Sequence, residues 1–196
     1  MNRLYLQDNI IELNDLIFSS SLGAGNFGNV FLVRNKFPYV IKAISKKNKL
    51  ILWITQKFGI RKRNSIKNKS SIYSKIIKTL KDNKFIYFLM EFIKGKELFE
   101  VIYDNGLLNK LETQFYSGSL LLVIDYFYER KVVYRNIKPE NVMVSGYLKL
   151  IEIATAKEII DRTNTIIGTP HYMTPEFILG EGYSFQIDIW SITICM

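Results

Sequence analysis

Residues 134–141 read Tyr-Arg-Asn-Ile-Lys-Pro-Glu-Asn, and this octapeptide decides the fold. Before it, residues 111–130 carry apolar side chains at helical spacing and predict the best helix of the chain. After it, residues 142–144 and 148–151 predict two short strands joined by a turn at Ser145-Gly146. We therefore expect the octapeptide to lie between a long helix and a β-hairpin.

The rest of the chain divides into a β-rich front and a helical back. Strands are expected at residues 16–33 (two, around a glycine-rich turn), 39–44, 75–80 and 85–92, and helices at 97–103 and 184–196. Residues 46–70 are basic with a weak helical period, and the residues between 151 and 184 are expected to be loop. This order predicts two lobes with a cleft near residues 91–97, and clefts between lobes usually hold ligands.

The composition indicates a globular, intracellular protein. The chain has 196 residues, of which 48% are hydrophobic and 23% are charged, so it can bury a core. Its single cysteine, Cys195, excludes an intrachain disulfide and fits a reducing compartment. There is no signal-peptide pattern and no apolar run of the roughly 18 residues that a membrane span needs. We expect a cytoplasmic location.

The net charge of +9 is unevenly distributed, because Asp82 is the only acidic residue between Lys42 and Phe85. Such a basic run is able to meet nucleic acid or an anionic membrane. It lacks the interleaved aromatic residues of a single-strand stacking platform, and we interpret it as a solvated basic face. Nucleic acid is therefore not an expected partner.

A glycine-rich turn near the N-terminus is a candidate phosphate site. Residues 22–30 read Leu-Gly-Ala-Gly-Asn-Phe-Gly-Asn-Val, and glycine lets backbone N–H groups approach phosphate oxygens. A strand rather than a helix follows at Val30, which disfavours a dinucleotide-binding fold. Lys42 in the next strand is positioned to hold the α- and β-phosphates. The alternatives are a hairpin without a ligand and a solvated lysine.

The octapeptide resembles the protein kinase catalytic loop, His-Arg-Asp-x-x-x-x-Asn, with Tyr134 for His as in the cyclic-nucleotide-dependent kinases. Residues 152–154 (Glu-Ile-Ala) fall where those kinases carry Asp-Phe-Gly, and residues 174–176 (Thr-Pro-Glu) fall where they carry Ala-Pro-Glu. Asp188 matches the aspartate of the next large helix. Residues 81–92, 162–176 and 179–190 resemble cyclic GMP-dependent kinases in particular. Over residues 16–196 the chain thus resembles a serine/threonine kinase domain of the AGC type.

The resemblance implies an α+β, bilobal fold. Residues 1–15 would be an N-terminal extension, 16–92 a small β-rich N-lobe and 93–196 a partial, mostly helical C-lobe. The family continues with further helices after the one at Asp188, so we expect a truncated domain with exposed apolar surface.

The resemblance also implies an ATP site and a Mg²⁺ site. The nucleotide would be contacted by Gly23, Ala24, Gly25, Gly28, Val30, Lys42, Met90, Glu91, Ile93, Glu97 and Met143. Among these, Met90 would be the gatekeeper, residues 91–93 the hinge that binds adenine, and Glu97 a contact to the ribose or to a basic substrate residue.

Further roles follow for the second lobe. Lys138 would serve the γ-phosphate, while Asn141 and Glu152 would hold the metal. Thr165 would be the phosphorylated residue of the activation loop, with Arg135 and Lys157 as partners of its phosphate. An unmodified loop threonine is the alternative.

Several residues depart from the family pattern. Asn136 replaces the catalytic aspartate, and an amide cannot act as a base at neutral pH. Glu152 keeps the charge of the metal-binding aspartate but adds a methylene, and Ala154 replaces its glycine. No Asp or Glu lies between Lys42 and Asp82 to supply the glutamate that pairs with the lysine in the family, a position that falls near Arg61.

Three functions remain open. The first is a catalytically impaired pseudokinase that binds ATP weakly and acts by contact, for instance on a related kinase or a regulatory protein. The second is an active kinase that transfers the γ-phosphoryl of ATP to Ser or Thr near basic residues, because phosphoryl transfer relies chiefly on positioning and electrostatics. The third is a truncated, non-functional fragment.

Overall fold

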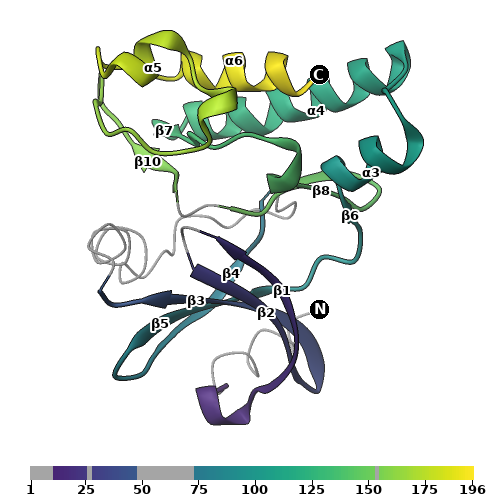
Figure 1. The fold of residues 1–196 in the computed structure, drawn as a ribbon, viewed down its shortest axis with the longest axis vertical. Helices are drawn as coiled ribbons and strands as arrows, with labels where there is room; N and C mark the ends of the chain where they lie inside the picture. The colour runs from purple at the N-terminus through teal and green to yellow at the C-terminus, as the bar shows by residue number, and fades with distance from the viewer. Residues whose placement is uncertain (1–10, 26–27, 48–72, 153–154) are drawn as a thin grey trace. The chain divides into compact units, whose positions relative to one another are not determined.

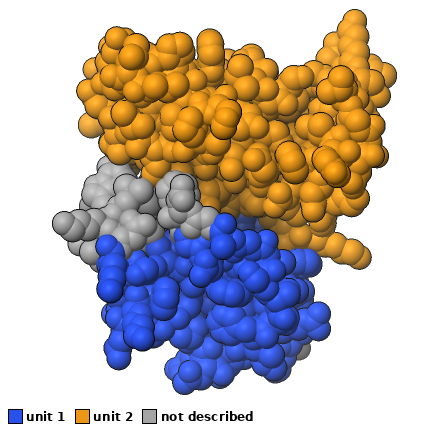
Figure 2. Space-filling view, viewed as in Figure 1, with its two compact units in different colours: residues 1–92 blue, residues 93–196 orange. Residues whose placement is uncertain are grey.

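The computed structural model describes residues 11–25, 28–47, 73–152 and 155–196. The chain divides into two compact units, Met1–Phe92 and Ile93–Met196, which are coloured separately in Figure 2. The expected helical period around residues 50–58 and the position near Arg61 lie outside the described residues.

The first unit is built on a five-stranded antiparallel sheet with the order β1-β2-β3-β5-β4. Its strands are β1 (Ile17–Gly25), β2 (Gly28–Asn35), β3 (Phe37–Ser45), β4 (Ile76–Lys81) and β5 (Phe85–Glu91), and a 3-10 turn, η2 (Leu13–Asp15), precedes them. All five strands predicted from β-branched and aromatic runs are confirmed. The β4–β5 turn is closed by Asp82, whose Oδ1 accepts hydrogen bonds from the backbone N–H groups of Lys84 and Phe85 at 2.6 and 2.7 Å.

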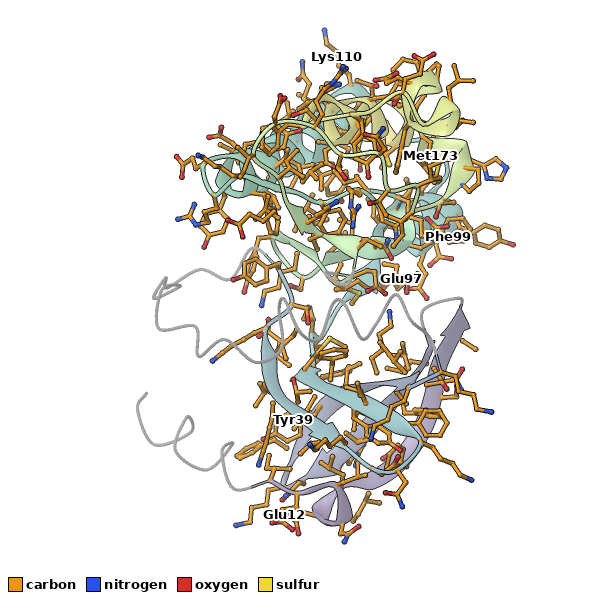
Figure 3. All side chains as sticks on the ribbon, turned by 90° about the vertical axis from the view of Figure 1, so that its left-hand side faces the viewer. Glu12, Tyr39, Glu97, Phe99, Lys110 and Met173 are labelled. Atoms are coloured by element: carbon orange, nitrogen blue, oxygen red, sulfur yellow. The ribbon has the colours of Figure 1, made fainter. Side chains whose placement is uncertain are left out.

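One face of this sheet forms the core of the unit. Val33 lies opposite Tyr39, and Ile41 lies opposite Leu89, so these side chains share a face. Ile11 and Leu16 cover them, and the resulting cluster is buried throughout. Tyr39 is seen among the strands in Figure 3. The segment before β1 therefore contributes to the core.

The second unit is mainly helical (Figure 1). It contains β6 (Lys96–Glu97), α3 (Leu98–Asn105), α4 (Lys110–Tyr128), β7 (Val132–Val133), η4 (Pro139–Asn141), β8 (Val142–Val144), β9 (Leu148–Leu150), β10 (Lys157–Glu158), η6 (Pro170–Tyr172), α5 (Pro175–Leu179) and α6 (Gln186–Cys195). β6, β8 and β9 form a three-stranded sheet, and β10 pairs with β7. α4 packs beside α6.

Both helices of the front half of this unit begin with reciprocal caps. Asn109 caps α4 by accepting hydrogen bonds from the backbone N–H groups of Leu111 and Glu112 at 2.9 and 3.0 Å, and Glu112 bonds back to the Asn109 N–H. At α3, Glu97 and Glu100 form the same kind of capping box. The predicted helix at residues 97–103 is confirmed, with Glu97 as its cap.

The prediction of continuous loop between residues 151 and 184 is wrong. This stretch contains β10, η6 and the short helix α5. The helix is fixed by local chemistry: the Thr174 hydroxyl accepts a hydrogen bond from the Phe177 N–H at 3.3 Å, Pro175 occupies the first turn, and Gly180 ends it with a φ of 71°. Thr-Pro followed by a glycine is a start-and-stop signal that the sequence already carried.

The expected exposed apolar surface is present on α4, where Leu122 is 74% exposed while Leu120 and Val123 beside it are buried. No helix among the described residues combines the length and the apolar character that crossing a bilayer requires.

Candidate active site

The second face of the five-stranded sheet gathers the residues predicted to bind a nucleotide. Gly23 pairs with Val30, Val30 with Lys42, and Val40 with Met90. Because directly opposed residues and alternate residues of a strand share a face, these side chains lie on the face opposite the core cluster. Lys42 is only 6% exposed. A buried lysine flanked by aliphatic side chains is suited to hold a phosphate beside an apolar ring.

Gly28 and Gly23, both in the glycine-rich stretch, have different roles. A Cβ at Gly28, whose φ is 116°, would come within 2.3 Å of the backbone oxygen of Ala43, so the fold itself requires glycine there. A Cβ at Gly23 would meet no atom within 4 Å. The space at Gly23 is open to a ligand. Gly25 pairs with Gly28, and Ala24 pairs with Asn29.

The expected hinge residues fall at the end of β5. Glu91 is paired with Lys75 in both directions: its backbone N–H donates to the Lys75 carbonyl at 3.1 Å, and its Oε1 accepts from the Lys75 N–H at 3.2 Å. Ile93 is the first residue of the second unit. The Glu91 side chain therefore stabilises the backbone rather than reaching for a ligand.

Asp188 of α6 holds the start of the loop formed by residues 134–141. Its two carboxylate oxygens accept hydrogen bonds from the backbone N–H groups of Tyr134 and Arg135, each at 2.8 Å. Burial raises the pKa of Asp188 to about 7, and the two N–H bonds and the charge of Arg135 oppose that rise. The carboxyl group is fully buried and serves the backbone of the loop.

Arg135 is bent into the interior. Its φ is 72°, and its Nε donates to the Thr155 carbonyl at 2.6 Å while Nη1 donates to the Tyr183 hydroxyl at 3.1 Å. Only 3% of the residue is exposed. Thr155 also donates from its hydroxyl to the Tyr134 carbonyl at 3.0 Å, so the loop is tied to the segment after residue 154 from both sides.

Asn136 sits at the centre of the loop and is 6% exposed. Its backbone oxygen accepts a hydrogen bond from Asn141 Nδ2 at 2.8 Å, and its side-chain Oδ1 accepts one from the Thr169 hydroxyl at 3.1 Å. Gly168 permits this approach, because a Cβ there would lie 2.6 Å from the Arg135 backbone oxygen. The amide is thus oriented by a hydroxyl from a segment far along the sequence.

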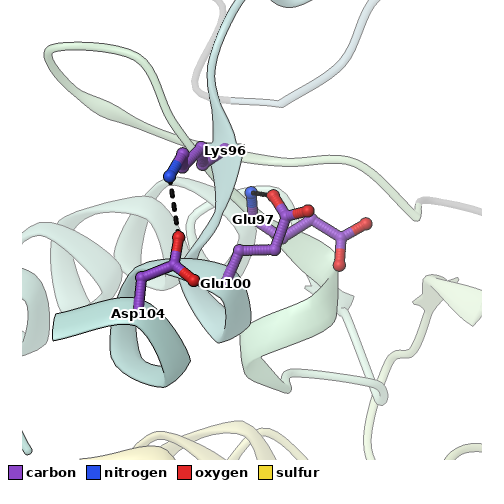
Figure 4. Close-up of polar contacts among 4 residues, drawn as sticks. All are labelled: Lys96, Glu97, Glu100 and Asp104. Atoms are coloured by element: carbon purple, nitrogen blue, oxygen red, sulfur yellow. Dashed lines mark hydrogen bonds and ion pairs between the residues drawn. The ribbon is translucent and has the colours of Figure 1, made fainter. Parts of the chain in front are cut away.

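Two further predicted residues, Lys138 and Met143, follow Asn136 along the chain. Lys138 Nζ lies 3.6 Å from Oε1 of Glu140. Met143 is paired with Glu97 between β8 and β6. Burial, followed by the charges of Glu100 and Glu140, raises the pKa of Glu97, while Lys138 lowers it. The charges of Glu140 and Lys138 therefore both act on Glu97. Figure 4 shows Glu97 beside Glu100, whose carboxylate accepts the Glu97 N–H.

A protein kinase domain model matches residues 16–196 of the chain. The chain belongs to the protein kinase family. Similar relatives include the cGMP-dependent protein kinases of Plasmodium berghei (strain Anka), 41% identical over 99% of this chain, and of Toxoplasma gondii, 37% identical over 99%. The cAMP-dependent protein kinase catalytic subunit PRKX of Mus musculus is 31% identical over 93% of this chain.

These similarities identify a serine/threonine kinase domain of the AGC type, near the cGMP-dependent kinases, and confirm the predicted α+β kinase fold class. The chain spans 23% and 20% of the lengths of the two cGMP-dependent relatives and 53% of the third. Kinases of this family use ATP and Mg²⁺ in general.

The metal ligands expected of a kinase fit Mg²⁺ in kind. Asn141 Nδ2 is engaged with the Asn136 carbonyl, which leaves Oδ1 of Asn141 as its acceptor, and Glu152 supplies a carboxylate. Amide and carboxylate oxygens are the ligands that Mg²⁺ prefers. Within the described part of the chain, no group of three His, Cys, Asp or Glu residues could hold a metal by itself.

Thr165, the predicted phosphorylation site, is contacted by Lys157, Thr163 and Tyr183. Lys157 Nζ donates to the hydroxyls of Thr163 at 2.5 Å and of Thr165 at 3.3 Å. The Tyr183 hydroxyl donates to the Thr165 carbonyl. Of the two predicted phosphate partners, Lys157 reaches Thr165 directly, while Arg135 reaches it through Tyr183.

Sequence reasoning missed Thr155, Thr169 and Tyr183 as residues that organise the site. Thr169 lies in the Gly-Thr-Pro-His-Tyr stretch that carried the resemblance, so a signal for it was present. Nothing local marks Thr155, since its partners Tyr134 and Arg135 are distant in sequence.

Proposed function

We propose that this kinase domain binds a nucleotide but is catalytically impaired, and that it acts by contact with another protein. The observation that carries the proposal is Asn136, an amide at the position of the catalytic base, with its Oδ1 already accepting a hydrogen bond from Thr169. We likewise propose residues 16–92 as its N-lobe and residues 93–196 as its C-lobe part, after an extension of residues 1–15.

The chemical argument rests on what an amide can do. In a working kinase, the aspartate accepts the proton of the substrate hydroxyl. Asn136 has no basic site at neutral pH, and general-base catalysis is worth roughly 10²–10⁴ in rate. Glu152 adds a methylene to the metal-binding carboxylate, and Mg²⁺ demands near-ideal geometry at short distances. Both changes weaken transfer more than they weaken binding.

The nucleotide-binding half of the machinery is retained in this proposal. The sheet face of Gly23, Val30 and Met90 would receive the adenine and the ribose, and Lys42 would bind the phosphates. Lys138 would contact the terminal phosphate. Mg²⁺, when bound by Asn141 Oδ1 and Glu152, would neutralise charge on the phosphates.

A partner surface is suggested by the carboxylates of the second unit. Glu100 and Glu140 are close enough to Glu97 for their charges to act on it. Glu140 Oε2 is buried, and no hydrogen-bond partner for it exists among the described residues. A guanidinium or ammonium group from a peptide would satisfy it. We propose a related kinase or a regulatory protein with a basic segment, in the cytoplasm, as the partner.

The proposal is tested by separating nucleotide binding from turnover. The melting temperature is measured with a non-hydrolysable ATP analogue, with and without Mg²⁺, and phosphoryl transfer is assayed with Mg²⁺ and with Mn²⁺. We expect a shift in melting temperature and no transfer. Lys42→Met should abolish the shift, while Lys47→Met, on an exposed lysine of the same unit, should preserve it. Transfer that disappears in Lys42→Met would end this proposal.

A second candidate, an active kinase with basic-residue preference, is favoured by the intact frame of the loop. Asp188 and Asn141 make the bonds that hold the backbone of residues 134–136. Since phosphoryl transfer relies chiefly on positioning, a well-held loop without a base can retain residual transfer. The same assay decides between the two candidates.

A further inference from the structure

The side chain of Asn136 has one end occupied and one end available. Oδ1 accepts the Thr169 hydroxyl, but Nδ2, which carries two donors, has no hydrogen-bond partner among the residues that the structure describes. The residue is 6% exposed. Nδ2 is not one of the fully buried atoms that lack a partner, so it can be reached by a ligand, and a ligand that brings an acceptor gains a hydrogen bond at this point.

Thr169 determines which end of the amide is available. It is the N-cap of η6, yet its side chain makes no capping bond, so its hydroxyl is committed to Asn136. Gly168, with a φ of 131°, brings it against the loop. The replacement of an aspartate by Asn136 therefore does more than remove a base, because it presents a donor where the family presents an acceptor.

Lys138, two residues further along the same loop, carries additional donors. Its Nζ is 3.6 Å from Glu140 Oε1, which is an ion pair longer than a hydrogen bond, and no hydrogen bond of Nζ is found in the described residues. A serine hydroxyl brings its own proton and suits an acceptor. A phosphate monoester brings only acceptor oxygens and about two negative charges, and suits Asn136 Nδ2 together with the ammonium of Lys138.

We propose that the loop formed by residues 134–141 binds the phosphorylated serine or threonine side chain of a peptide, instead of an unmodified hydroxyl awaiting transfer. The inference rests on the proposed function, since it names the ligand class through which an impaired domain acts by binding. The phosphate is received by Asn136 Nδ2 and Lys138 Nζ, and a basic residue next to it is received by Glu140.

A nucleotide phosphate offers the same oxygens, and charge decides between the two sources. Glu97, Glu100 and Glu140 lie in the same unit as Asn136, and the charges of Glu100 and Glu140 both act on Glu97. Carboxylates attract the arginine or lysine of a peptide, a group that a nucleotide does not carry. The peptide source matches both the donors and the carboxylates.

The test uses fluorescence anisotropy with three labelled peptides of one sequence, each with arginines before the central residue. That residue is phosphoserine, serine or alanine, and neither nucleotide nor divalent cation is present. A hydrogen bond to a charged group is worth about 1.5–3 kcal/mol, so the phosphoserine peptide should bind roughly 10- to 100-fold more tightly than the serine peptide. The alanine peptide should match the serine peptide.

Variants locate the effect. Asn136→Asp replaces the donor by a negative charge and should remove the preference for phosphoserine over serine. Thr169→Val frees the amide to turn and should reduce the preference. Gln186→Glu makes the same amide-to-carboxylate change on the exposed first residue of α6 and should leave it intact. Circular dichroism and the melting temperature show that each variant is folded.

The outcomes separate the two ideas. Equal binding of the three peptides, or binding of none, overturns the phosphoserine site while leaving nucleotide binding without turnover untouched. If Asn136→Asp weakens the ATP analogue as much as the phosphopeptide, and the two compete, the donor belongs to the nucleotide and the peptide assignment is wrong. Phosphoryl transfer by the unaltered protein would overturn the proposed function even if phosphopeptides bind.

Discussion

The sheet face of the first unit and the loop of the second unit differ in how far they retain the residue types of the kinase family. On the sheet, Gly23, Val30 and Lys42 retain the residue types that a kinase uses to hold a nucleotide. In the loop, Asp188 and Asn141 hold the backbone, while Asn136 stands where we propose that the reacting group has been replaced. A fold can thus preserve a site's architecture while a single side chain changes its chemistry.

The strongest way to break this comparison is to restore the replaced groups. In the double variant Asn136→Asp, Glu152→Asp, the frame is already present, so we expect phosphoryl transfer to rise by roughly 10² or more, the usual worth of a general base. The measurement is transfer of labelled phosphate to a basic serine peptide. The matched control Gln186→Glu should show no rise. If the double variant remains silent although it binds nucleotide, the defect lies in the frame rather than in the replaced side chains.

The two glycines sharpen the comparison within the sheet. Gly28→Ala would force a Cβ to 2.3 Å from the Ala43 oxygen at a positive φ, and we expect a loss of roughly 2–4 kcal/mol in the free energy of unfolding. Gly23→Ala meets open space and should change stability by less than about 0.5 kcal/mol, yet weaken the ATP analogue. Urea denaturation and analogue titration measure both. Equal stability losses in the two variants would contradict the division between a structural and a ligand-facing glycine.

Asp188 tests the frame of the loop. Asp188→Asn places an NH₂ group against a backbone N–H donor and should cost about 1–3 kcal/mol in unfolding free energy. The pKa of Asp188 is raised from 3.8 to about 7, so the folded state binds a proton that the unfolded chain releases between these values. Its stabilising contribution is full below pH 4 and is lost as the pH rises through 7.

Denaturation of the unaltered protein and of Asp188→Asn at pH 5 and at pH 8 tests this expected direction of the change in stability with pH. The difference in stability between the unaltered protein and Asp188→Asn should be larger at pH 5 and smaller at pH 8. A difference that grows with pH would mean that the two backbone N–H bonds outweigh burial at this carboxyl group.

Much of this arrangement follows from local sequence, and the rest depends on distant pairs. The strands are marked by β-branched runs such as residues 39–44, and the loop at residues 134–141 is marked by its motif. The bonds that orient Asn136 and Arg135 come from Thr169 and Tyr183, which are 33 and 48 residues away. Periodicity and turn signals describe neighbours along the chain, so they do not reveal which distant hydroxyl will meet a buried amide.

The smallest expected effect is on the pKa of Glu97, in a variant that removes a neighbouring charge and leaves the fold unchanged. Burial and then Glu100 raise the pKa of Glu97, and Glu100 also accepts the Glu97 N–H at 3.0 Å in the cap of α3. Glu100→Gln keeps an acceptor for that bond, so stability should change by less than about 0.5 kcal/mol. Removing the charge should lower the pKa of Glu97, which a carboxyl-detected NMR titration follows. Glu112→Gln makes the same change in the capping box of α4 and should leave the pKa of Glu97 where it is. An unchanged Glu97 in both variants would mean that burial alone sets its pKa, and that the carboxylates around the loop do not act together on a basic ligand.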